Sequence, residues 1–178
     1  MELDNEIFLV KANESYLSQV AEYRKEFLDA NSSLDGCGPL RNCDDPKDWL
    51  DKTNALLSPD TLPENWVVST QFLCIRKSDN RLVGMIQVRH YFNDFLKQFG
   101  GNIGYSVRPS ERRKGYAKWM LKNCLPFCKE LNMDKVLVTC KDDNIGSRKT
   151  ILANSGVYEK TVFEPQKSVN LERYWIKL

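Results

Sequence analysis

The segment VRPSERRKGYAKWML, residues 107–121, constrains the fold more than any other stretch of this sequence. An extended segment ends at a proline, crosses a polar turn and enters an amphipathic helix that we predict over about 114–131. Arg112, Arg113 and Lys114 stand where this helix begins. Because the helix dipole makes an N-terminus electropositive, cations are unfavourable there. The chain must therefore join a strand to a helix through a basic turn that helix stability alone does not explain.

The basic turn is a local feature, because the whole chain is nearly neutral. Its 178 residues include 26 Lys and Arg against 24 Asp and Glu. An anion bound in the turn would remove the conflict with the helix dipole, and phosphates are common at helix N-termini. Gly115 would let such a ligand approach the backbone, and the small Ala117 keeps a second position open. Taken alone, the turn is equally well explained as a solvated basic surface.

The remaining patterns predict one mixed α/β (α+β) domain over residues 1–178, with a mixed central sheet of about six or seven strands. The predicted order is β-α-α-β-β-β-α-β-α-β-β. Strands are expected at 7–12, 66–77, 82–91, 100–109, 135–140, 157–163 and 168–178. Helices are expected after Asn13, near Pro46, over 114–131 and after Asn144, the last of them ending at Gly156. Pro126 is expected to kink or fray the final turn of the 114–131 helix.

Composition argues against several other classes of protein. The six cysteines form no C-x-x-C pair and there is a single histidine, which disfavours a metal site and a disulfide scaffold. The N-terminal residues lack the basic region of a secretory signal, and no apolar run approaches the roughly 20 residues of a membrane span. The balanced charge offers no broad basic face for nucleic acid. We therefore expect a cytoplasmic protein, monomeric or homodimeric, without metal, membrane or nucleic-acid partners.

In its context, the basic turn resembles the signature of the GCN5-related N-acetyltransferase (GNAT) superfamily, Arg/Gln-x-x-Gly-x-Gly/Ala. The signature stands here as RRKGYA, residues 112–117, and is preceded by V-x-P at 107–109. Downstream, KVLVTC, Asn144, SRKTILANSG and VYEKTVF take the places that a buried strand, an asparagine, a helix and an aromatic-bearing strand have in that superfamily. The resemblance covers nearly the whole chain and implies a single GNAT-like domain.

The resemblance also implies a cofactor and its binding residues. It implies that acetyl-CoA binds with its pyrophosphate on backbone N–H groups of 113–118 and its pantetheine arm beside the strand before the turn. The strand KVLVTC would diverge from that strand, leaving the thioester in the gap. The expected cofactor-binding residues are Tyr105, Ser106, Val107, Arg112, Arg113, Lys114, Gly115, Tyr116, Ala117, Lys118, Asn144 and Ser147. Asn144 is equally well explained as a helix cap.

The implied reaction is direct transfer of an acetyl group to a primary amine. His90, the only histidine, is a candidate base because its reference pKa is about 6.5, although a histidine at a strand end is often a structural group. Many members of the superfamily use a tyrosine seven residues after the asparagine as general acid, and Ile151 stands there in this chain. That departure leaves open a non-catalytic acyl-CoA-binding sensor on the same fold.

The acceptor is expected at the loops 31–49 and 91–101, and the sequence does not choose between a small-molecule and a peptide amine. The acidic residues in these loops would attract a cationic amine, or form a solvated acidic surface: Asp35, Asp44, Asp45, Asp48 and Asp94. The aromatic residues would form a hydrophobic lid, or ordinary packing: Tyr91, Phe92, Phe95 and Phe99.

Overall fold

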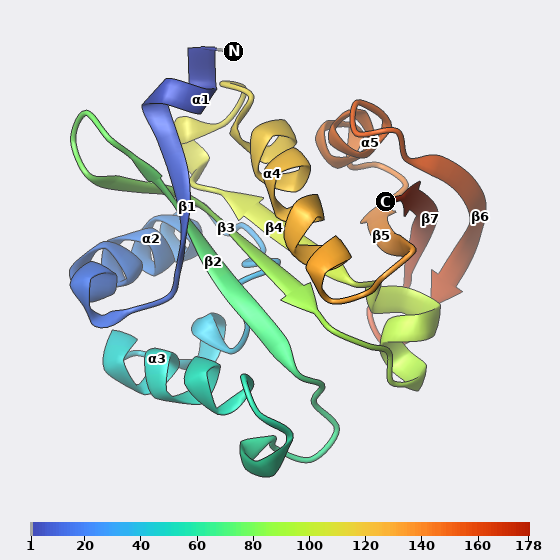
Figure 1. Cartoon of the computed structure of the whole chain (residues 1–178), viewed down its shortest axis with the longest axis horizontal. Coiled ribbons are helices and arrows are strands. Elements are labelled where there is room, and N and C mark those ends of the chain that lie inside the picture. Colours follow the sequence, from blue (N-terminus) through green and yellow to red (C-terminus); the bar gives the residue numbers. More distant parts are fainter. Residues whose placement is uncertain (1) are drawn as a thin grey trace.

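The computed structural model describes residues 2–178 as two β-sheets with helices packed against them (Figure 1). The strands are β1 (Ile7–Lys11), β2 (Ser69–Arg76), β3 (Arg81–Arg89), β4 (Ile103–Val107), β5 (Lys135–Lys141), β6 (Val157–Glu164) and β7 (Val169–Lys177). The first sheet has the order β1-β2-β3-β4 and the second the order β5-β7-β6, with antiparallel neighbours in both. The predicted single central sheet is thus divided in two between β4 and β5.

Five α-helices and several single turns accompany these strands. The α-helices are α1 (Glu2–Glu6), α2 (Leu17–Asp29), α3 (Pro46–Ala55), α4 (Tyr116–Glu130) and α5 (Ile145–Leu152). The single turns are η1 (Glu14–Tyr16), η2 (Leu40–Asn42), η3 (Pro59–Thr61), η4 (Leu96–Gly100) and η5 (Pro109–Glu111). Helix α4 crosses one face of the first sheet, α2 and α3 cover the other, and α5 lies beside the second sheet (Figure 1).

The predicted order of strands and longer helices is confirmed, with differences in detail. Helix α4 begins at Tyr116, two residues later than expected, because the turn before it extends through Gly115. Pro126 lies inside α4 and does not end it. The buried Cys124 and Cys128 flank this proline, so the last turns stay packed on the core although one backbone donor is missing. Helix α1 and the π-helical turn η4 were not predicted.

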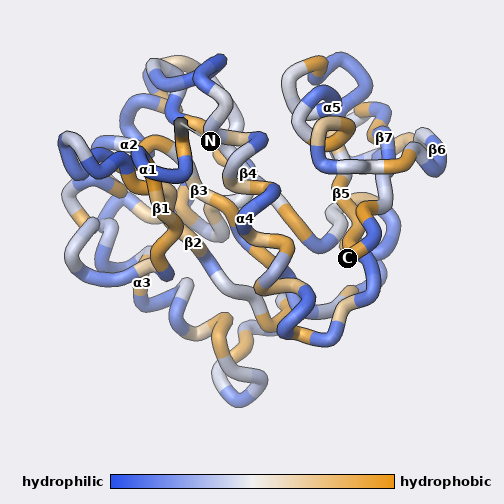
Figure 2. The backbone as a smooth tube through the Cα atoms, turned by 45° about the horizontal axis from the view of Figure 1, so that its top comes forward, coloured by the Kyte–Doolittle hydropathy of each residue, from blue (hydrophilic) through white to orange (hydrophobic). Residues whose placement is uncertain are grey.

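The four-stranded sheet is buried on both faces, and each face has its own hydrophobic core. One core lies between α4 and the strands and includes Met120, Ile86 and Val138. The other lies beneath α2 and α3 and includes Phe27, Trp49 and Met85. Figure 2 shows the hydrophobic segments along the central strands and the hydrophilic ones mostly on the outer helices and turns. At the boundary between the two sheets, the facing edges of β4 and β5 lack ladder partners along most of their length within the described chain.

Within residues 2–178, no helix is long and apolar enough to cross a lipid bilayer. The same residues bring together no cluster of three or more His, Cys, Asp or Glu side chains that would hold a metal ion. All six cysteines are free thiols in the interior.

Candidate functional site

The two sheets meet at Asn102, the residue before β4. Its backbone N–H donates to the carbonyl of Leu137 on β5 at 2.7 Å, and the N–H of Leu137 donates to Asn102 Oδ1 at 2.8 Å. Elsewhere in residues 2–178, no backbone hydrogen bond joins β4 to β5. The Asn102 side chain thus takes the place of a backbone carbonyl in one hydrogen bond between the two sheets. The edge of β4 that follows Asn102 has no partner strand among the described residues.

The unpaired edge of β4 presents the backbone of Tyr105. The N–H of Arg108 donates to the carbonyl of Val83, and the carbonyl of Asn102 accepts from Arg89, so even-numbered residues here turn their backbone groups toward β3. Because backbone groups alternate along an antiparallel strand, the N–H and C=O of Tyr105 face the gap between β4 and β5.

The two residues that follow Tyr105 make other contacts. The Ser106 hydroxyl lies in the core, 3.0 Å from Tyr23 Oη and 3.1 Å from Cys37 Sγ. The carbonyl of Val107 accepts a hydrogen bond from Arg112 Nε at 3.2 Å. Tyr105 and Val107 thus both turn their backbone toward the gap, but the Val107 carbonyl is occupied, so of the three residues expected to bind a pantetheine arm Tyr105 is the one with both its N–H and its C=O placed for it.

The turn before α4 leaves a run of backbone donors unpaired. The first N–H of this helix with an acceptor is that of Trp119, which donates to the carbonyl of Gly115 at 3.0 Å. Within residues 2–178, the N–H groups from Arg113 to Lys118 have no protein acceptor, and no side chain caps the helix. Orphan donors at an electropositive helix end form a ready site for an anion.

Two left-handed residues shape this turn. Arg113 has a φ of 65° and Gly115 a φ of 86°. Glycine adopts this conformation without cost, whereas for arginine it stores backbone strain. A Cβ atom at Gly115 would also lie 3.3 Å from Leu3 Cδ1, so α1 covers one side of this glycine. The turn is thus a strained backbone held by its surroundings.

The cations of the turn divide into two groups. Arg112 Nη2 donates to Ser32 Oγ at 2.7 Å and its guanidinium lies over the Phe27 ring, while Lys114 Nζ donates to Glu111 Oε2 at 2.7 Å. Arg113 and Lys118, in contrast, are exposed, and their side chains have no partner within the described chain. Two cations thus support the turn, and two are free to meet an anion.

Glu111 holds the turn to the sheet. Its carboxylate lies 2.8 Å from Arg76, 3.4 Å from Arg81 and 2.7 Å from Lys114. Burial acts to raise the pKa of Glu111, but hydrogen bonds from Arg76 and Lys114 outweigh it and lower that pKa. The anion closest to the predicted phosphate site is therefore neutralised by structural cations.

On the α4 side, a side-chain contact bridges the gap between β4 and α5. Tyr105 Oη lies 2.8 Å from Ser147 Oγ, and the N–H of Ser147 donates to Asn144 Oδ1 at 3.0 Å. Burial is the main cause that raises the pKa of Tyr105, so its phenol stays protonated. Asn144 caps α5, as one of its two interpretations predicted, and the structure brings it together with Tyr105 and Ser147.

On the opposite face, the 31–39 loop lies directly against β4. A Cβ atom at Gly36 would overlap the carbonyl of Gly104, so these two glycines bring the two backbones into contact. Gly36 has a φ of 67°, which glycine adopts readily. The side chain of the preceding Asp35 is exposed beside this contact, and its Oδ2 accepts from Ser33 Oγ at 2.6 Å.

Arg89, at the end of β3, lies on the same face. Its Nη1 donates to the carbonyls of Gly100 and Gly101 at 3.0 and 3.3 Å. Its Nη2 lies 3.1 Å from the position of a Cβ atom at Gly104, beside the strand that borders the gap. Burial is the main cause that lowers the pKa of Arg89 to about 10, which leaves the side chain protonated at neutral pH.

His90 points away from this site. Its Nε2 lies 2.9 Å from Thr70 Oγ1 on β2, and its ring faces Phe127 of α4. Burial, followed by the charge of Lys11, lowers the pKa of His90. The side chain lies on the α4 face, next to β1 and β2, whereas the 31–39 loop approaches β4 from the other face. These contacts fit the structural interpretation and do not support His90 as a base at the gap.

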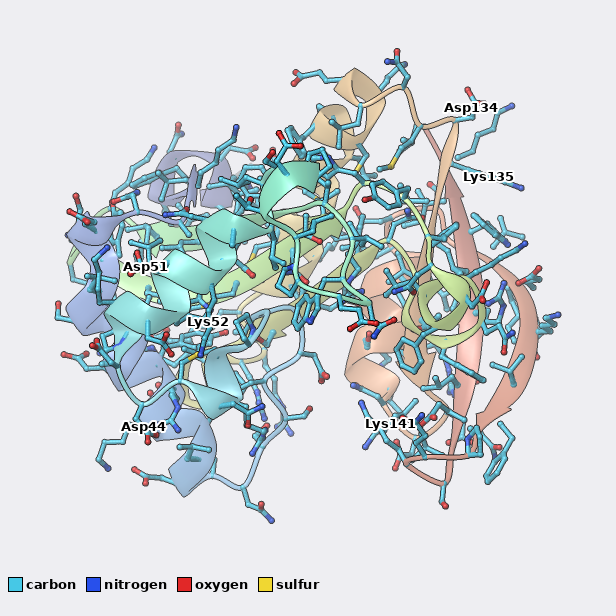
Figure 3. All side chains as sticks on the ribbon, turned by 90° about the horizontal axis from the view of Figure 1, so that it is seen from below. Asp44, Asp51, Lys52, Asp134, Lys135 and Lys141 are labelled. Carbon is cyan, nitrogen blue, oxygen red and sulfur yellow. The ribbon has the colours of Figure 1, made fainter. Side chains whose placement is uncertain are left out.

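The acidic residues expected near the acceptor have different surroundings. Asp44 pairs with Arg24, Asp45 caps α3 by accepting from the N–H of Lys47, and Asp48 pairs with Lys52. Figure 3 shows Asp44, Asp51 and Lys52 on the outer side of the α3 region, opposite the end of the molecule that carries Lys141. Of the five, Asp35 is the one that lies next to β4.

The fifth, Asp94, lines a cavity of about 520 Å³ between η4 and the second sheet. Arg173 on β7 closes one side and donates to the carbonyls of Lys97 and Gln98 at 2.6 and 2.7 Å. Of the four aromatic residues predicted as a lid, Phe99 lines this cavity. Phe92 packs on Trp175, and Phe95 packs on Phe99 with ring centroids 5.7 Å apart. The 91–101 segment therefore packs against the second sheet, and its aromatic residues fit the interpretation as ordinary packing.

Asn102, Arg89 and Gly36 were not among the predicted site residues. Asn102 directly precedes β4, and Arg89 ends the neighbouring strand β3. Gly36 contacts β4 from a loop that is far away in the sequence. The GGNIG run and the DGCG run carried a weak signal, since glycines in a strand or loop often mark a close backbone approach. Arg89 carried no signal, because it continues an ordinary apolar strand.

Comparisons with known proteins bear on the family and the fold. A sequence model described as an acetyltransferase (GNAT) domain matches residues 17–156. An uncharacterised N-acetyltransferase of Bacillus subtilis (strain 168), YnaD, is 27% identical over 97 residues. That match spans 52% of this chain and 55% of the relative, about half of each.

Solved structures share the whole fold at low sequence identity. RimL, a ribosomal L7/L12 alpha-N-protein acetyltransferase in complex with coenzyme A, has a TM-score of 0.73 at 14% identity, over 97% of this chain and 94% of that one. A ribosomal-protein-S5-alanine acetyltransferase from Vibrio fischeri also has a TM-score of 0.73, at 13% identity over 97% and 93%. A spermidine N-acetyltransferase from Vibrio cholerae has a TM-score of 0.66, at 12% identity over 97% and 94%.

Proposed function

The chain belongs to the GNAT acetyltransferase family, and on that premise we propose that it transfers an acetyl group from acetyl-CoA directly to a primary amine. The proposal treats residues 1–178 as one N-acetyltransferase domain. The observation that carries it is the run of unpaired N–H groups from Arg113 to Lys118 beside the unpaired edge of β4. One end of this arrangement suits a diphosphate and the other an extended amide-containing chain.

The turn before α4 supplies the phosphate site. Its N–H groups converge at the positive end of a helix, and Arg113 and Lys118 add free positive charge. The strained φ of Arg113 is also explained, because functional sites commonly retain such conformations. We assign the pyrophosphate to the backbone of residues 113–118, with Gly115 and Ala117 leaving room for it.

The gap between β4 and β5 supplies the site for the pantetheine arm and the thioester. The N–H and C=O of Tyr105 face this gap and would bond an extended arm as a neighbouring strand would. The N–H that binds the thioester carbonyl would then stabilise the negative charge that develops on its oxygen. Asn144 and Ser147 would border the arm on the α5 side.

The acceptor amine would approach from the face that carries the 31–39 loop, because Tyr105 and Ser147 close the other face. Direct attack on the thioester fits the state of the Cys37 thiol, which lies beside β4. Cys37 is fully buried, bonded to Ser106, and burial raises the pKa of its thiol to about 12. Such a thiol is a poor nucleophile, so an acyl-cysteine intermediate is disfavoured.

A second candidate function is an acyl-CoA sensor that binds without turnover. The observation in its favour is Ile151, which stands where many family members have a tyrosine acid and is fully buried in the core. Tyr105, whose phenol is placed at the gap, is bonded to Ser147. This candidate shares the phosphate site and differs only in the absence of transfer.

Two measurements on the same protein separate these functions. Titration calorimetry with CoA and acetyl-CoA tests the binding site, and a thiol-release assay with acetyl-CoA and a broad amine panel tests transfer. Binding with thiol release above the acceptor-free rate supports the enzyme. Binding with no release on any amine supports the sensor, and the absence of binding rejects both.

A further inference from the structure

Arg89 is a cation without a structural counter-ion at the edge of the proposed transfer site. Within residues 2–178, none of the ion pairs includes Arg89. Its Nη1 is engaged by two backbone carbonyls, but Nη2 has no acceptor in the same residues. This half-buried cation thus has no carboxylate partner in the described residues, and one end of its guanidinium remains available to an anionic ligand.

The free end of this guanidinium points toward β4. Nη2 lies 3.1 Å from where a Cβ atom of Gly104 would be, and Gly104 is the residue before Tyr105. Any side chain at Gly104 would meet both Arg89 and the backbone of Gly36. The missing side chain therefore leaves Nη2 beside the backbone that we assign to the thioester.

Asp35 supplies an opposite charge on the same face. Its carboxylate acts on the pKa of Arg89 through its charge, although the two side chains form no ion pair. Asp35 is exposed in the 31–39 loop, next to the contact between Gly36 and Gly104. A separated anion and cation at one site match a ligand that carries both charges a short distance apart.

We propose that the acceptor is zwitterionic, an amine with a carboxylate close to it, as in an α-amino acid. Arg89 binds the carboxylate through Nη2, and Asp35 attracts the ammonium group to the mouth of the gap. The ammonium group then loses one proton to solvent, its nitrogen bonds to the acetyl carbon, and the carbon–sulfur bond breaks with release of the thiolate, which takes up the second proton lost by the nitrogen. This inference rests on the proposed function and narrows its acceptor class.

The test compares matched acceptors with the unmodified protein. Each amino acid in a panel is assayed by thiol release beside its α-carboxamide and its decarboxylated amine, which differ only at the group that Arg89 would bind. We expect kcat/KM to be at least about 100-fold higher for the free acid, because a site built to bond a polar group rejects analogues that lack it. Equal rates across a set, or transfer only to amines without a carboxylate, would overturn the inference.

The Arg89→Gln variant tests the residue itself. We expect KM for the acid to rise about 100-fold and the preference over the amide to fall below about 5-fold, with Arg89→Lys recovering part of it. An equal loss on acid and amide would show that Arg89 only holds Gly100 and Gly101, and would contradict our assignment. If Arg89→Gln does not fold, Asp35→Asn replaces it, because this exposed side chain has no packing role. It should lower kcat/KM for the zwitterion about 10-fold, and an unchanged value would count against the pair.

Calorimetry with CoA distinguishes the two levels of the proposal. Neither variant touches the turn before α4, so both should bind CoA as the unmodified protein does. If the unmodified protein binds CoA and acetylates only neutral or polycationic amines, the proposed function stands and the inference fails. If it does not bind CoA at all, both fail together.

Discussion

The first turns of α3 and α4 solve the same problem in opposite ways. Helix α3 is complete in itself: Asp45 accepts from the N–H of Lys47, and Pro46 at the first position has no N–H to satisfy. Helix α4 begins at Tyr116, after Gly115, with no side-chain cap, a run of unpaired donors and several cations. One helix end is thus stabilised by its own cap, and the other has the free donors that we assign to a ligand.

The largest effect is expected from an acidic residue placed in the turn before α4. In Gly115→Asp, the new carboxylate would occupy the electropositive turn and repel phosphate, so we expect CoA affinity to fall at least about 100-fold in calorimetry. Gly115→Asn is the matched control, because asparagine, like aspartate, tolerates a positive φ better than most residues other than glycine, and it carries no charge. It should bind CoA within about 10-fold of the unmodified protein. Equal affinity for the two variants would argue against phosphates in this turn.

The two helix ends also differ in the contacts that hold them in place. Because α4 lacks its own cap, its start depends on Glu111 and the ion pairs with Arg76, Arg81 and Lys114. We expect Glu111→Gln to lower the free energy of unfolding by about 2 kcal/mol at neutral pH, since it removes the charge of a buried carboxylate that three cations share. Lys114→Gln, at a half-exposed position, should cost less than about 1 kcal/mol.

The pH dependence of the same variant follows from the lowered pKa of Glu111. Folding favours its ionised form, so its contribution is full above the unfolded-state pKa near 4.5 and is lost as the pH falls through the lower folded-state value. Urea denaturation curves of the two proteins should therefore converge below about pH 4.5. A difference in stability that stays constant into acid would show that shape, not charge, is responsible.

Removing the local cap of α3 gives a smaller effect. Asp45→Ala should lower the free energy of unfolding by about 1 kcal/mol and leave CoA affinity unchanged, because α3 lies far from the turn before α4. Asp44→Ala is the control, since this almost fully exposed carboxylate makes only a surface ion pair with Arg24 and should cost less than about 0.5 kcal/mol. If urea denaturation shows that the two variants lose the same free energy of unfolding, the cap of α3 contributes no more than a surface ion pair.

These helix ends also show how far the sequence could be interpreted by itself. The caps at Asn13, Asp45 and Asn144 follow from local chemistry, and the structure has all three. The basic turn before α4 was singled out for the same reason, because its cations conflict with helix stability, although the helix begins two residues later than expected. Local conflicts are visible in a sequence without knowledge of the fold.

Features that depend on distant partners were not predictable in this way. Asn102 separates the two sheets by bonding Leu137, and nothing in the GGNIG run names that partner. Helix α1 is too short to be stable alone and is held by Asp4, which accepts from Trp119 Nε1 at 2.7 Å. The reference pKa of histidine made His90 a candidate base, but the pairing of β2 with β3 decides which face of the sheet its ring occupies. Tertiary contacts placed each of these residues.

The smallest expected effect concerns the strain in the turn before α4. Arg113 has a φ of 65° and an exposed side chain without a partner in the described residues. Arg113→Gly removes the strain, so it should raise the free energy of unfolding by up to about 1 kcal/mol, although the greater chain entropy of glycine offsets part of this gain. It also removes one of two free cations, so CoA should bind a few-fold more weakly. Arg113→Gln separates the effects, because it keeps the strain and loses the charge. If Arg113→Gly lowers stability, or binds CoA more tightly, then strain and charge in this turn do not serve the phosphate site as we propose.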